Sequence, residues 1–485
     1  MNQTARTFTL VGTIVITLLL MHQLPTLSIG ETELRHVSVL GDVIKTQGEN
    51  QNIDVIPKPD APKSLLVKNK KGEKVVFKDS VPPGVTMIED YSSGNANGME
   101  HFYAMLNTVK QLNRPVRIAY FGDSFIEGDI YTSDLREMLQ SKFGGNGAGW
   151  IDAGSVFNKG FRRTILQNYS GIREFQVVKK PFNNEVQGFN QRYFVPSEGA
   201  HVTTKGTDAM PHAARWQNAR LFFRTAGGLS IKAKVTAAPS KGKGAAGKNN
   251  TSSQPEETGM ASSFHMNGSS SVQMVELKGD MQEINYTFTN IGNGTYLYGM
   301  SLESDRGVIL DNYSMRGSAG FTIANVPQRT MDDFARLRPY DLIILHFGLN
   351  VASPKSGTAH YRAYCKRMMK VVDKLRAAFP EASILIMGVP DRDQRSADGI
   401  TTMKGVEELL ACQREMAADG KIAFLDLFTA MGGRASMRKL VEQKCANKDY
   451  THINMKGGKI IGKHVFNSIV AGYDNYVRRK AYENE

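Results

Sequence analysis

The chain has 485 residues, of which 41% are hydrophobic and 22% are charged, a composition typical of a folded protein with more than one domain and not of a disordered chain. Its formal net charge of +13 favours acidic surfaces or polyanionic glycans as neighbours. No nucleic-acid-binding motif accompanies that charge, so we expect no nucleic-acid partner.

The first 30 residues have the features of an export signal. Arg6 precedes an apolar run from Phe8 to Met21, and Pro25 follows that run. The run is short for a membrane span but has the length of a signal-peptide core. We therefore expect residues 1–30 to be a signal peptide or an uncleaved membrane anchor. Either one predicts an exported protein, located in the periplasm or the cell envelope.

Residues 31–98 are polar and contain scattered prolines, which predicts a linker with a few short strands. One of these strands is expected at Lys74-Val75-Val76-Phe77. A helical pattern then runs from Met99 to Leu112, and this helix should pack beside the first buried strand. It opens an α/β domain whose first part is predicted to cover residues 99–157.

The centre of that first part is a strand, a turn and a helix. The apolar run Val116–Phe121 has the length of a buried strand and ends at Gly122-Asp123-Ser124. A helical pattern follows and stops at Gly144-Gly145. A serine at this position lies at the carboxyl end of the sheet, where open α/β sheets bind ligands. The alternative is that Asp123 and Ser124 only make the turn or cap the helix.

A glycine-rich stretch, Gly144–Trp150, comes next. Glycines at this density allow close backbone approach or a positive φ. A phosphate-binding loop would need a following Lys-Ser or Lys-Thr, which is absent. We therefore expect this stretch to form a wall of a substrate cleft.

Residues 158–305 change to short runs in which apolar and polar residues alternate, separated by glycine-rich breaks. A period of two predicts antiparallel strands, here arranged as a β-sandwich. Clear examples are Ala219–Phe223, Leu229–Ala233 and Ile284–Phe288, and the low-complexity stretch Pro239–Ser263 predicts a loop. The block is therefore an insert in the α/β domain, whose second part covers residues 306–485.

The second part repeats the alternation of strands and helices. Strands are predicted at Gly307–Asp311, Asp341–Phe347, Ser383–Gly388 and Ile422–Asp426. Helices are predicted to begin at Thr330, to run from Ala359 to Phe379, and to begin again near Met455. Near-continuous apolar strands separated by helices predict a parallel sheet that is covered on both faces.

Polar residues follow several of these strands and meet at one edge of the predicted sheet. They include the parts that acyl transfer needs: Ser124 as nucleophile, His452 as its base and Asp449 as the group that orients the base. The backbone N–H groups of Ser124 and Gly317 and the side-chain amide of Asn350 would stabilise the tetrahedral oxyanion. The sequence therefore predicts a serine hydrolase site.

In this order the blocks resemble those of the SGNH (GDSL-type) hydrolase family: Gly122-Asp123-Ser124, Gly317, Gly348-Leu349-Asn350 and Asp449-x-x-His452. The longer stretch Gly122–Asp129, followed by Leu135-Arg136, resembles the branch that contains bacterial peptidoglycan O-acetylesterases and exported polysaccharide O-acetylation proteins. The resemblance implies a flavodoxin-like, three-layer α/β/α fold with a parallel sheet, interrupted by a β-sandwich that resembles a carbohydrate-binding module. It implies neither a metal ion nor an organic cofactor.

The resemblance and the predicted triad together indicate an exported serine esterase that removes O-acetyl groups from a bacterial glycan, with peptidoglycan as the leading substrate. Two alternatives stay open. An O-acetyltransferase that takes acetyl from a membrane-bound acyltransferase partner would use the same triad. A non-catalytic glycan-binding protein would have its affinity in the insert. A lipid or thioester substrate fits less well because the sequence has no long apolar lid.

Other reactive or aromatic residues are expected to be structural. None of the three cysteines, Cys365, Cys412 and Cys445, has the spacing of a zinc site, and Cys365 falls in a helical pattern as a core residue would. His346 lies within an apolar strand and is expected in the core. Trp150 and Trp216 could either stack on sugar rings or pack in the core.

Overall fold

The computed structural model describes residues 56–62, 65–94, 97–237, 259–396 and 399–485, together with residues 9, 10, 13, 17, 28, 29, 32 and 33. Residues 1–55 form one unit, in which the described residues include the strands β1 (Ser28–Ile29) and β2 (Thr32–Glu33), and Ile56–Glu485 form the other. The predicted export signal and most of the predicted loop Pro239–Ser263 lie outside the described residues. Within the described ranges, no helix is both long enough and apolar enough to cross a membrane.

The larger unit contains a six-stranded sheet in the order β15-β6-β16-β17-β20-β5. Its strands are β15 (Val308–Ser314), β6 (Val116–Gly122), β16 (Leu342–His346), β17 (Ser383–Met387), β20 (Ala423–Leu425) and β5 (Glu89–Asp90). The first five are parallel and β5 is antiparallel. Counted along the chain, the parallel strands have the order 2-1-3-4-5 of a flavodoxin-like sheet. The predicted fold class is therefore confirmed, with β5 as an unpredicted edge strand.

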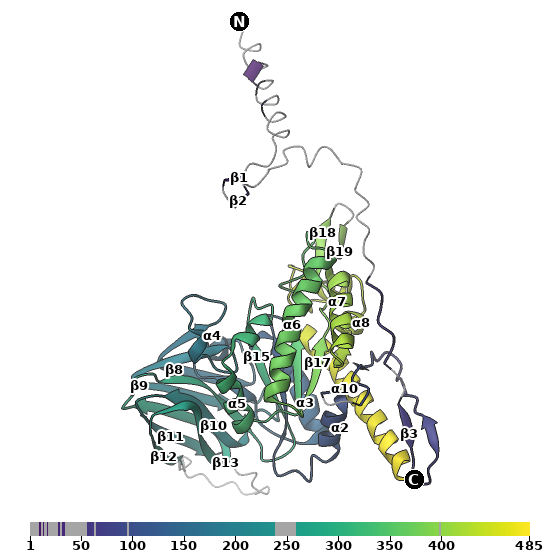
Figure 1. Ribbon diagram of the computed structural model, residues 1–485. Helices are drawn as coiled ribbons and strands as arrows, with labels where there is room; N and C mark the ends of the chain where they lie inside the picture. Colours follow the sequence, from purple (N-terminus) through teal and green to yellow (C-terminus); the bar gives the residue numbers. More distant parts are fainter. Residues whose placement is uncertain are drawn as a thin grey trace, which may run out of the picture. The chain divides into compact units, whose positions relative to one another are not determined.

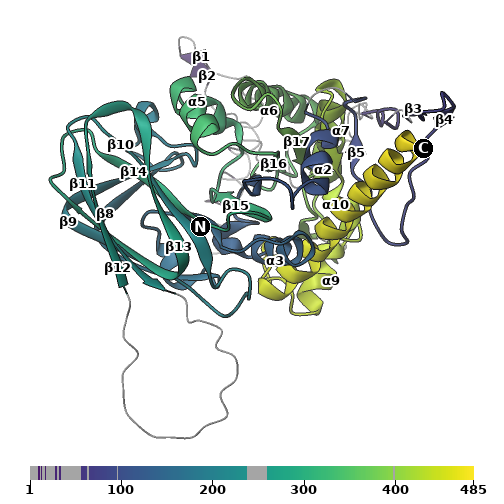
Figure 2. The same ribbon diagram turned by 90° about the horizontal axis from the view of Figure 1, so that it is seen from below.

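Helices cover both faces of this sheet, because its strands are apolar on both sides and cannot face water. One layer contains α2 (Met99–Asn107), α3 (Thr132–Phe143) and α10 (Met455–Asn484), and the other contains α5 (Gln328–Leu337), α6 (Thr358–Ala378) and α7 (Val406–Asp419) (Figure 2). Shorter helices are α4 (Val156–Gly160), α8 (Leu427–Ala430), α9 (Ser436–Glu442), η1 (Glu127–Asp129), η2 (Asn184–Val186) and η3 (Phe321–Asn325). The helix expected to begin at Thr330 begins at Gln328, directly after Pro327, whose fixed φ suits a helix start.

Residues between α3 and β15 form an eight-stranded antiparallel sheet (Figure 1). Its strands are β7 (Gly149–Asp152), β8 (Ile165–Gln176), β9 (Arg192–Gly206), β10 (Trp216–Thr225), β11 (Leu229–Ala237), β12 (Gly259–Met266), β13 (Ser269–Thr289) and β14 (Tyr296–Glu303). The first half of β13 pairs with β10, and its second half pairs with β11 and β9. The sheet therefore wraps around a hydrophobic core of its own, which includes Phe194, Trp216 and Phe288. The expected antiparallel character of the insert is confirmed.

The glycine-rich stretch lies at the seam between the two sheets and does not form a cleft wall. A Cβ atom at Gly147 would lie 2.2 Å from the carbonyl oxygen of Leu302, and one at Gly149 would lie 2.5 Å from that of Leu310. Both glycines have positive φ. Their missing side chains allow the backbone of this stretch to touch β14 of the antiparallel sheet and β15 of the parallel sheet.

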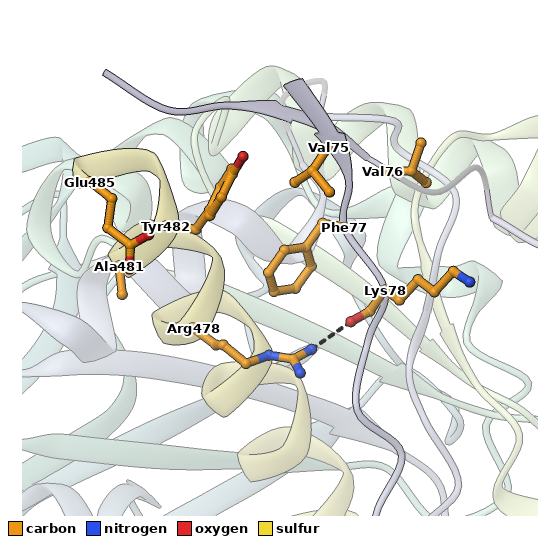
Figure 3. Close-up of a pocket in the computed structure, with 8 residues that line it drawn as sticks. All are labelled: Val75, Val76, Phe77, Lys78, Arg478, Ala481, Tyr482 and Glu485. Carbon is orange, nitrogen blue, oxygen red and sulfur yellow. Dashed lines mark hydrogen bonds between the residues drawn. The ribbon is translucent and has the colours of Figure 1, made fainter. Parts of the chain in front are cut away.

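Two short strands, β3 (Leu66–Lys68) and β4 (Lys74–Val76), pair as a hairpin in the region predicted as a linker, and β4 matches the predicted strand there. The hairpin packs against the end of α10, and a cavity of about 390 Å³ lies between them (Figure 3). In this cavity Arg478 donates a hydrogen bond to the carbonyl oxygen of Lys78 and stacks on the ring of Phe77. The cavity contains none of the predicted site residues.

A buried ionic cluster joins the two sheets at the seam. Arg338 Nε lies 2.6 Å from Asp311 Oδ2 and Arg338 Nη1 lies 2.8 Å from Glu303 Oε2, and all three side chains are fully buried. Arg117 Nη2 lies 2.8 Å from the other oxygen of Glu303. Asp311 is on β15 and Glu303 is on β14, so the cluster connects the parallel and the antiparallel sheet.

We expect the substitution Arg338→Met to lower the free energy of unfolding by about 3–5 kcal/mol, because it leaves the buried Asp311 without its ion-pair partner and removes one of the arginines that pair with Glu303. Urea unfolding followed by circular dichroism would measure the loss. Arg336→Met is the matched control: Arg336 is exposed and pairs with Asp333, so its loss should cost less than about 1 kcal/mol. Equal effects of the two substitutions would contradict the structural importance of the cluster.

Candidate active site

Ser124 lies directly after β6, at the carboxyl edge of the parallel sheet. The strand is fully buried as far as Gly122, and the chain then turns sharply into η1. A Cβ atom at Gly122 would lie 2.9 Å from the side chain of Ile126, so a larger residue inside this turn would force Ile126 to move. The turn leaves Ser124 half-buried, between a rigid strand and the surface.

His452 and Asp449 lie on the loop between α9 and α10, and they approach Ser124 although 328 positions separate His452 from it. Ser124 Oγ is 3.0 Å from His452 Nε2, and His452 Nδ1 is 2.8 Å from Asp449 Oδ2. The other oxygen of Asp449 accepts the backbone N–H groups of Thr451 and His452, each at 3.0 Å. Partial burial raises the pKa of Asp449, but these hydrogen bonds outweigh it and hold the pKa below its ordinary value. An ionised Asp449 keeps a proton on Nδ1, so that Nε2 can accept the hydroxyl proton of Ser124.

The loop after β15 brings Gly317 to the same edge. Met315 N–H donates to Gly122 O at 2.8 Å, which fixes the loop against the end of β6. Arg192, from β9 of the antiparallel sheet, donates to Ser314 O at 3.0 Å and thereby holds the start of the same loop. Gly317 has a φ of +77°, a conformation that a residue with a side chain rarely adopts.

Asn350 follows β16 and faces both neighbouring loops. Its amide nitrogen donates to Asp123 Oδ2 at 3.1 Å and to Ser318 O at 3.0 Å. In the described part of the chain, neither the Ser124 nor the Gly317 backbone N–H group donates a hydrogen bond. The structure thus brings all five predicted site residues to one edge of the sheet, and the backbone N–H groups of Ser124 and Gly317 there have no acceptor among the described residues.

Asp123 is a site residue whose contacts the sequence did not predict. Its side chain is buried, with Oδ1 accepting from the Phe125 N–H at 2.9 Å and Oδ2 accepting from Asn350. Burial raises its pKa to about 7, against the weaker opposing effect of these hydrogen bonds. The motif Gly-Asp-Ser contained the residue, but the partner 227 positions away was not visible in the sequence.

The raised pKa of Asp123 predicts a measurable pH dependence of stability. The folded protein keeps the proton up to about pH 7, whereas the unfolded chain loses it near pH 4, so ionisation of Asp123 opposes folding increasingly between pH 4 and pH 7. The variant Asp123→Asn lacks this titration. Its free energy of unfolding relative to wild type should therefore rise by up to about 4 kcal/mol from pH 4 to pH 8. Asp208→Asn, at an exposed aspartate, is the control, and a flat difference for Asp123→Asn would contradict the prediction.

A second unpredicted contribution comes from the segment between β17 and the hairpin that follows it. Arg392 Nη1 donates to Leu349 O at 3.0 Å, and the N–H of Asp393 donates to Tyr450 O at 3.1 Å. Leu349 precedes Asn350, and Tyr450 lies between Asp449 and His452. The segment therefore links the two loops that carry the site residues, and it continues into the hairpin of β18 (Asp393–Ser396) and β19 (Gly399–Thr402) (Figure 1).

The site is shallow and open to solvent. The side chain of Asp449 is 48% exposed and that of His452 is 33% exposed, and both Gly317 and Asn350 are exposed. A long chain could therefore lie across the serine without entering a deep pocket.

The remaining candidate residues are structural. His346 is buried beside Tyr120, whose hydroxyl lies 3.1 Å from Nδ1, and burial lowers the pKa of His346 to about 3. Trp150 and Trp216 are both buried, so neither offers a ring face to a sugar. The three cysteines are buried and unpaired. The expectation that His346 and Cys365 belong to the core is confirmed.

Comparisons with known proteins agree with this geometry. Residues 293–460 match the family described as GDSL-like lipase/acylhydrolase. A solved structure of a peptidoglycan O-acetylesterase has a TM-score of 0.61 and 20% sequence identity, and the match covers 80% of this chain and 99% of that chain. The similarity therefore extends over the parallel sheet and beyond it, and at this identity it shows a shared fold. No curated protein matches the chain in sequence.

Two other solved structures match about a third of the chain. The acetyl xylan esterase AlAXEase is 16% identical, with 33% of this chain and 81% of that chain covered and a TM-score of 0.26. The carbohydrate acetylesterase Est24 from Sinorhizobium meliloti is 14% identical, with 34% and 79% covered and a TM-score of 0.24. These scores are too low to support an argument about this chain.

Proposed function

We propose that this chain, which carries a domain of the GDSL-like lipase/acylhydrolase family, is an exported serine esterase that removes O-acetyl groups from a bacterial glycan. Peptidoglycan is the leading substrate. The observation that carries the proposal is the hydrogen-bonded row from Ser124 Oγ through His452 to Asp449. The likeness to a peptidoglycan O-acetylesterase over most of both chains supports the choice of substrate.

In the proposed reaction, Ser124 Oγ attacks the carbonyl carbon of the acetyl group while His452 Nε2 takes the hydroxyl proton. Asp449 stabilises the resulting imidazolium and keeps its orientation. The carbonyl oxygen becomes an oxyanion that accepts hydrogen bonds from the N–H groups of Ser124 and Gly317 and from the amide of Asn350, which first gives up its hydrogen bond to Asp123 or to Ser318 O. These donors lie on three different loops, so the oxyanion site exists only in the folded sheet.

The intermediate then collapses to an acetyl-serine. The C–O bond to the sugar breaks, and the sugar oxygen takes the proton back from His452. A water molecule, deprotonated by His452, attacks the acetyl-serine and releases acetate. The exposure of His452 and Asp449 gives water direct access to this second step, which favours hydrolysis over transfer of the acetyl group to another sugar.

Acetate release from O-acetylated peptidoglycan, compared with release from acetylated xylan, tests the proposal. We expect the wild-type protein to act on peptidoglycan with the higher kcat/KM. Adding an acceptor glycan should leave the rate of acetate release unchanged if the protein is a hydrolase. Acetyl groups that appear on the acceptor instead of in solution would contradict hydrolysis and favour an acetyltransferase.

A further inference from the structure

Arg392 carries a positive charge that the protein leaves uncompensated beside the proposed active site. Its guanidinium makes one hydrogen bond, from Nη1 to Leu349 O, and it forms no ion pair within the described part of the chain. Several arginines that are buried to a similar degree are paired, such as Arg414 with Glu89 and Asp426. Arg392 is half-buried and has free N–H groups. Two such N–H groups of a planar guanidinium can donate parallel hydrogen bonds to the two oxygens of a planar anionic group such as a carboxylate.

Arg392 lies close to the residues of the proposed active site. Its one hydrogen bond ends on the residue before Asn350, whose amide lies 3.1 Å from the side chain of Asp123, the neighbour of Ser124. The backbone N–H of the next residue, Asp393, donates a hydrogen bond to the carbonyl oxygen of Tyr450, on the loop that carries His452. Arg392 therefore lies between the loop that carries Asn350 and the loop that carries His452.

Other exposed cations lie near the site: Lys355 and Lys448 on the loops that carry Asn350 and His452, Arg395 in β18 and Lys456 at the start of α10. Together with Arg392 we call these residues the cationic rim. Within the described residues, none of the five forms an ion pair. The described carboxylates of these segments are Asp391, Asp393 and Asp449. Asp449 binds His452, Asp391 accepts hydrogen bonds from Thr402, Ser436 and Met437, and Asp393 accepts one from the N–H of Arg438. The five cations outnumber these three carboxylates, so the cationic rim attracts anionic substrates.

We propose that Arg392, supported by the cationic rim, recognises a carboxylate on the saccharide whose acetyl group is removed. The inference rests on the proposed function and extends it: the substrate is an acidic acetylated sugar, and neutral acetylated glycans are poorer substrates. The guanidinium pairs with the carboxylate through its free N–H groups, while the hydrogen bond to Leu349 O keeps it in place. Arg392 acts as a specificity residue and takes no part in bond breaking.

A pair of ligands that differ only in charge tests this inference: O-acetylated N-acetylmuramic acid and its carboxamide. Binding is measured by calorimetry on the Ser124→Ala variant, which cannot turn the ligands over, and kcat/KM is measured on the otherwise wild-type protein. We expect the acid to be favoured tenfold or more in both measurements, which corresponds to one charge-assisted hydrogen-bonded pair. Arg392→Gln should remove this preference: the ratio of the two kcat/KM values, and the ratio of the two dissociation constants, should fall to about one, whatever the variant's absolute activity.

Two further variants separate recognition from structural support. Arg392→Lys keeps the charge without the planar guanidinium and should restore part of the preference for the acid. Arg306→Gln is the matched control, because Arg306 also donates to a backbone carbonyl, that of Lys110, but near the amino end of β15. Equal losses on both ligands for Arg392→Gln would show that Arg392 only supports Leu349, and an unchanged preference would show that it does not recognise the carboxylate. Either result overturns the inference.

The two proposals fail in different ways. If wild-type protein hydrolyses both ligands, Ser124→Ala does not, and the acid has no advantage, only the inference about Arg392 is wrong. If the Ser124→Ala variant binds the acid preferentially but no acetate ester is hydrolysed by wild type, the esterase proposal is wrong and recognition by Arg392 stands.

Discussion

Replacing Ser124 with alanine is expected to lower the rate of acetate release by about 10³-fold or more. The methyl group of alanine cannot form the acetyl-enzyme, and His452 then has no hydroxyl to activate. The fold should not change, because Ser124 contributes only its hydroxyl contact with His452 and lies at the surface end of a rigid strand. Acetate release from O-acetylated peptidoglycan, measured under kcat/KM conditions, gives the loss directly.

Ser197→Ala is the matched control, since Ser197 is exposed and bonds only the carbonyl oxygen of Gly171 in the antiparallel sheet. We expect wild-type activity from that variant. Equal acetate release by Ser124→Ala and wild type would remove Ser124 as the nucleophile. In that case the row of hydrogen bonds from Ser124 to Asp449 would have a structural role only.

Substituting Asp449 with asparagine is expected to lower kcat by about 10³- to 10⁴-fold while leaving substrate binding nearly unchanged. Asp449 Oδ2 accepts the Nδ1 proton of His452 at 2.8 Å. An amide group there can donate to Nδ1 instead, which moves the histidine proton to Nε2 and leaves Ser124 without a base. Steady-state kinetics on the same substrate separate kcat from KM.

Asp474→Asn, at an exposed aspartate of α10, controls for a general loss of negative charge and should keep full activity. A loss of less than about tenfold for Asp449→Asn would mean that His452 is held in its working orientation by other contacts. The backbone contacts of Thr451 and His452 with Asp449 Oδ1 can persist with an asparagine oxygen, so the variant isolates the effect on the imidazole.

The sequence predicted the parallel sheet well because each buried strand is a continuous apolar run. The predicted strands Asp341–Phe347 and Ser383–Gly388 enclose the observed β16 and β17 with at most one extra residue at either end. The two-residue strand β5 was not predicted, since Glu89 and Asp90 have no apolar pattern and pair only because β20 lies beside them. Strands that have an apolar pattern of their own could be predicted from the sequence. A strand that forms only because it pairs with a neighbouring strand could not.

The same distinction applies to the site. The sequence placed Ser124, Asn350 and His452 at strand ends or before a helix, and the structure brings them together. It did not predict the contacts of Asp123 and Arg392, because each depends on a loop that is distant in the sequence. The glycine-rich stretch was misassigned for a related reason: the residues that explain it, Leu302 and Leu310, belong to other strands.

The hydrogen bond from Arg192 to Ser314 O has a consequence for modularity. The antiparallel sheet has its own core and is an obvious unit to exchange between related enzymes or to trim away. Yet one of its buried arginines holds the loop that presents Gly317, and Asp152 and Glu174 of the same sheet orient that arginine. The antiparallel sheet is therefore not a freely interchangeable module. A sheet transplanted from a related enzyme must bring this arginine and its carboxylate partners with it. The sequence of the insert is thus constrained by the active site of the other domain.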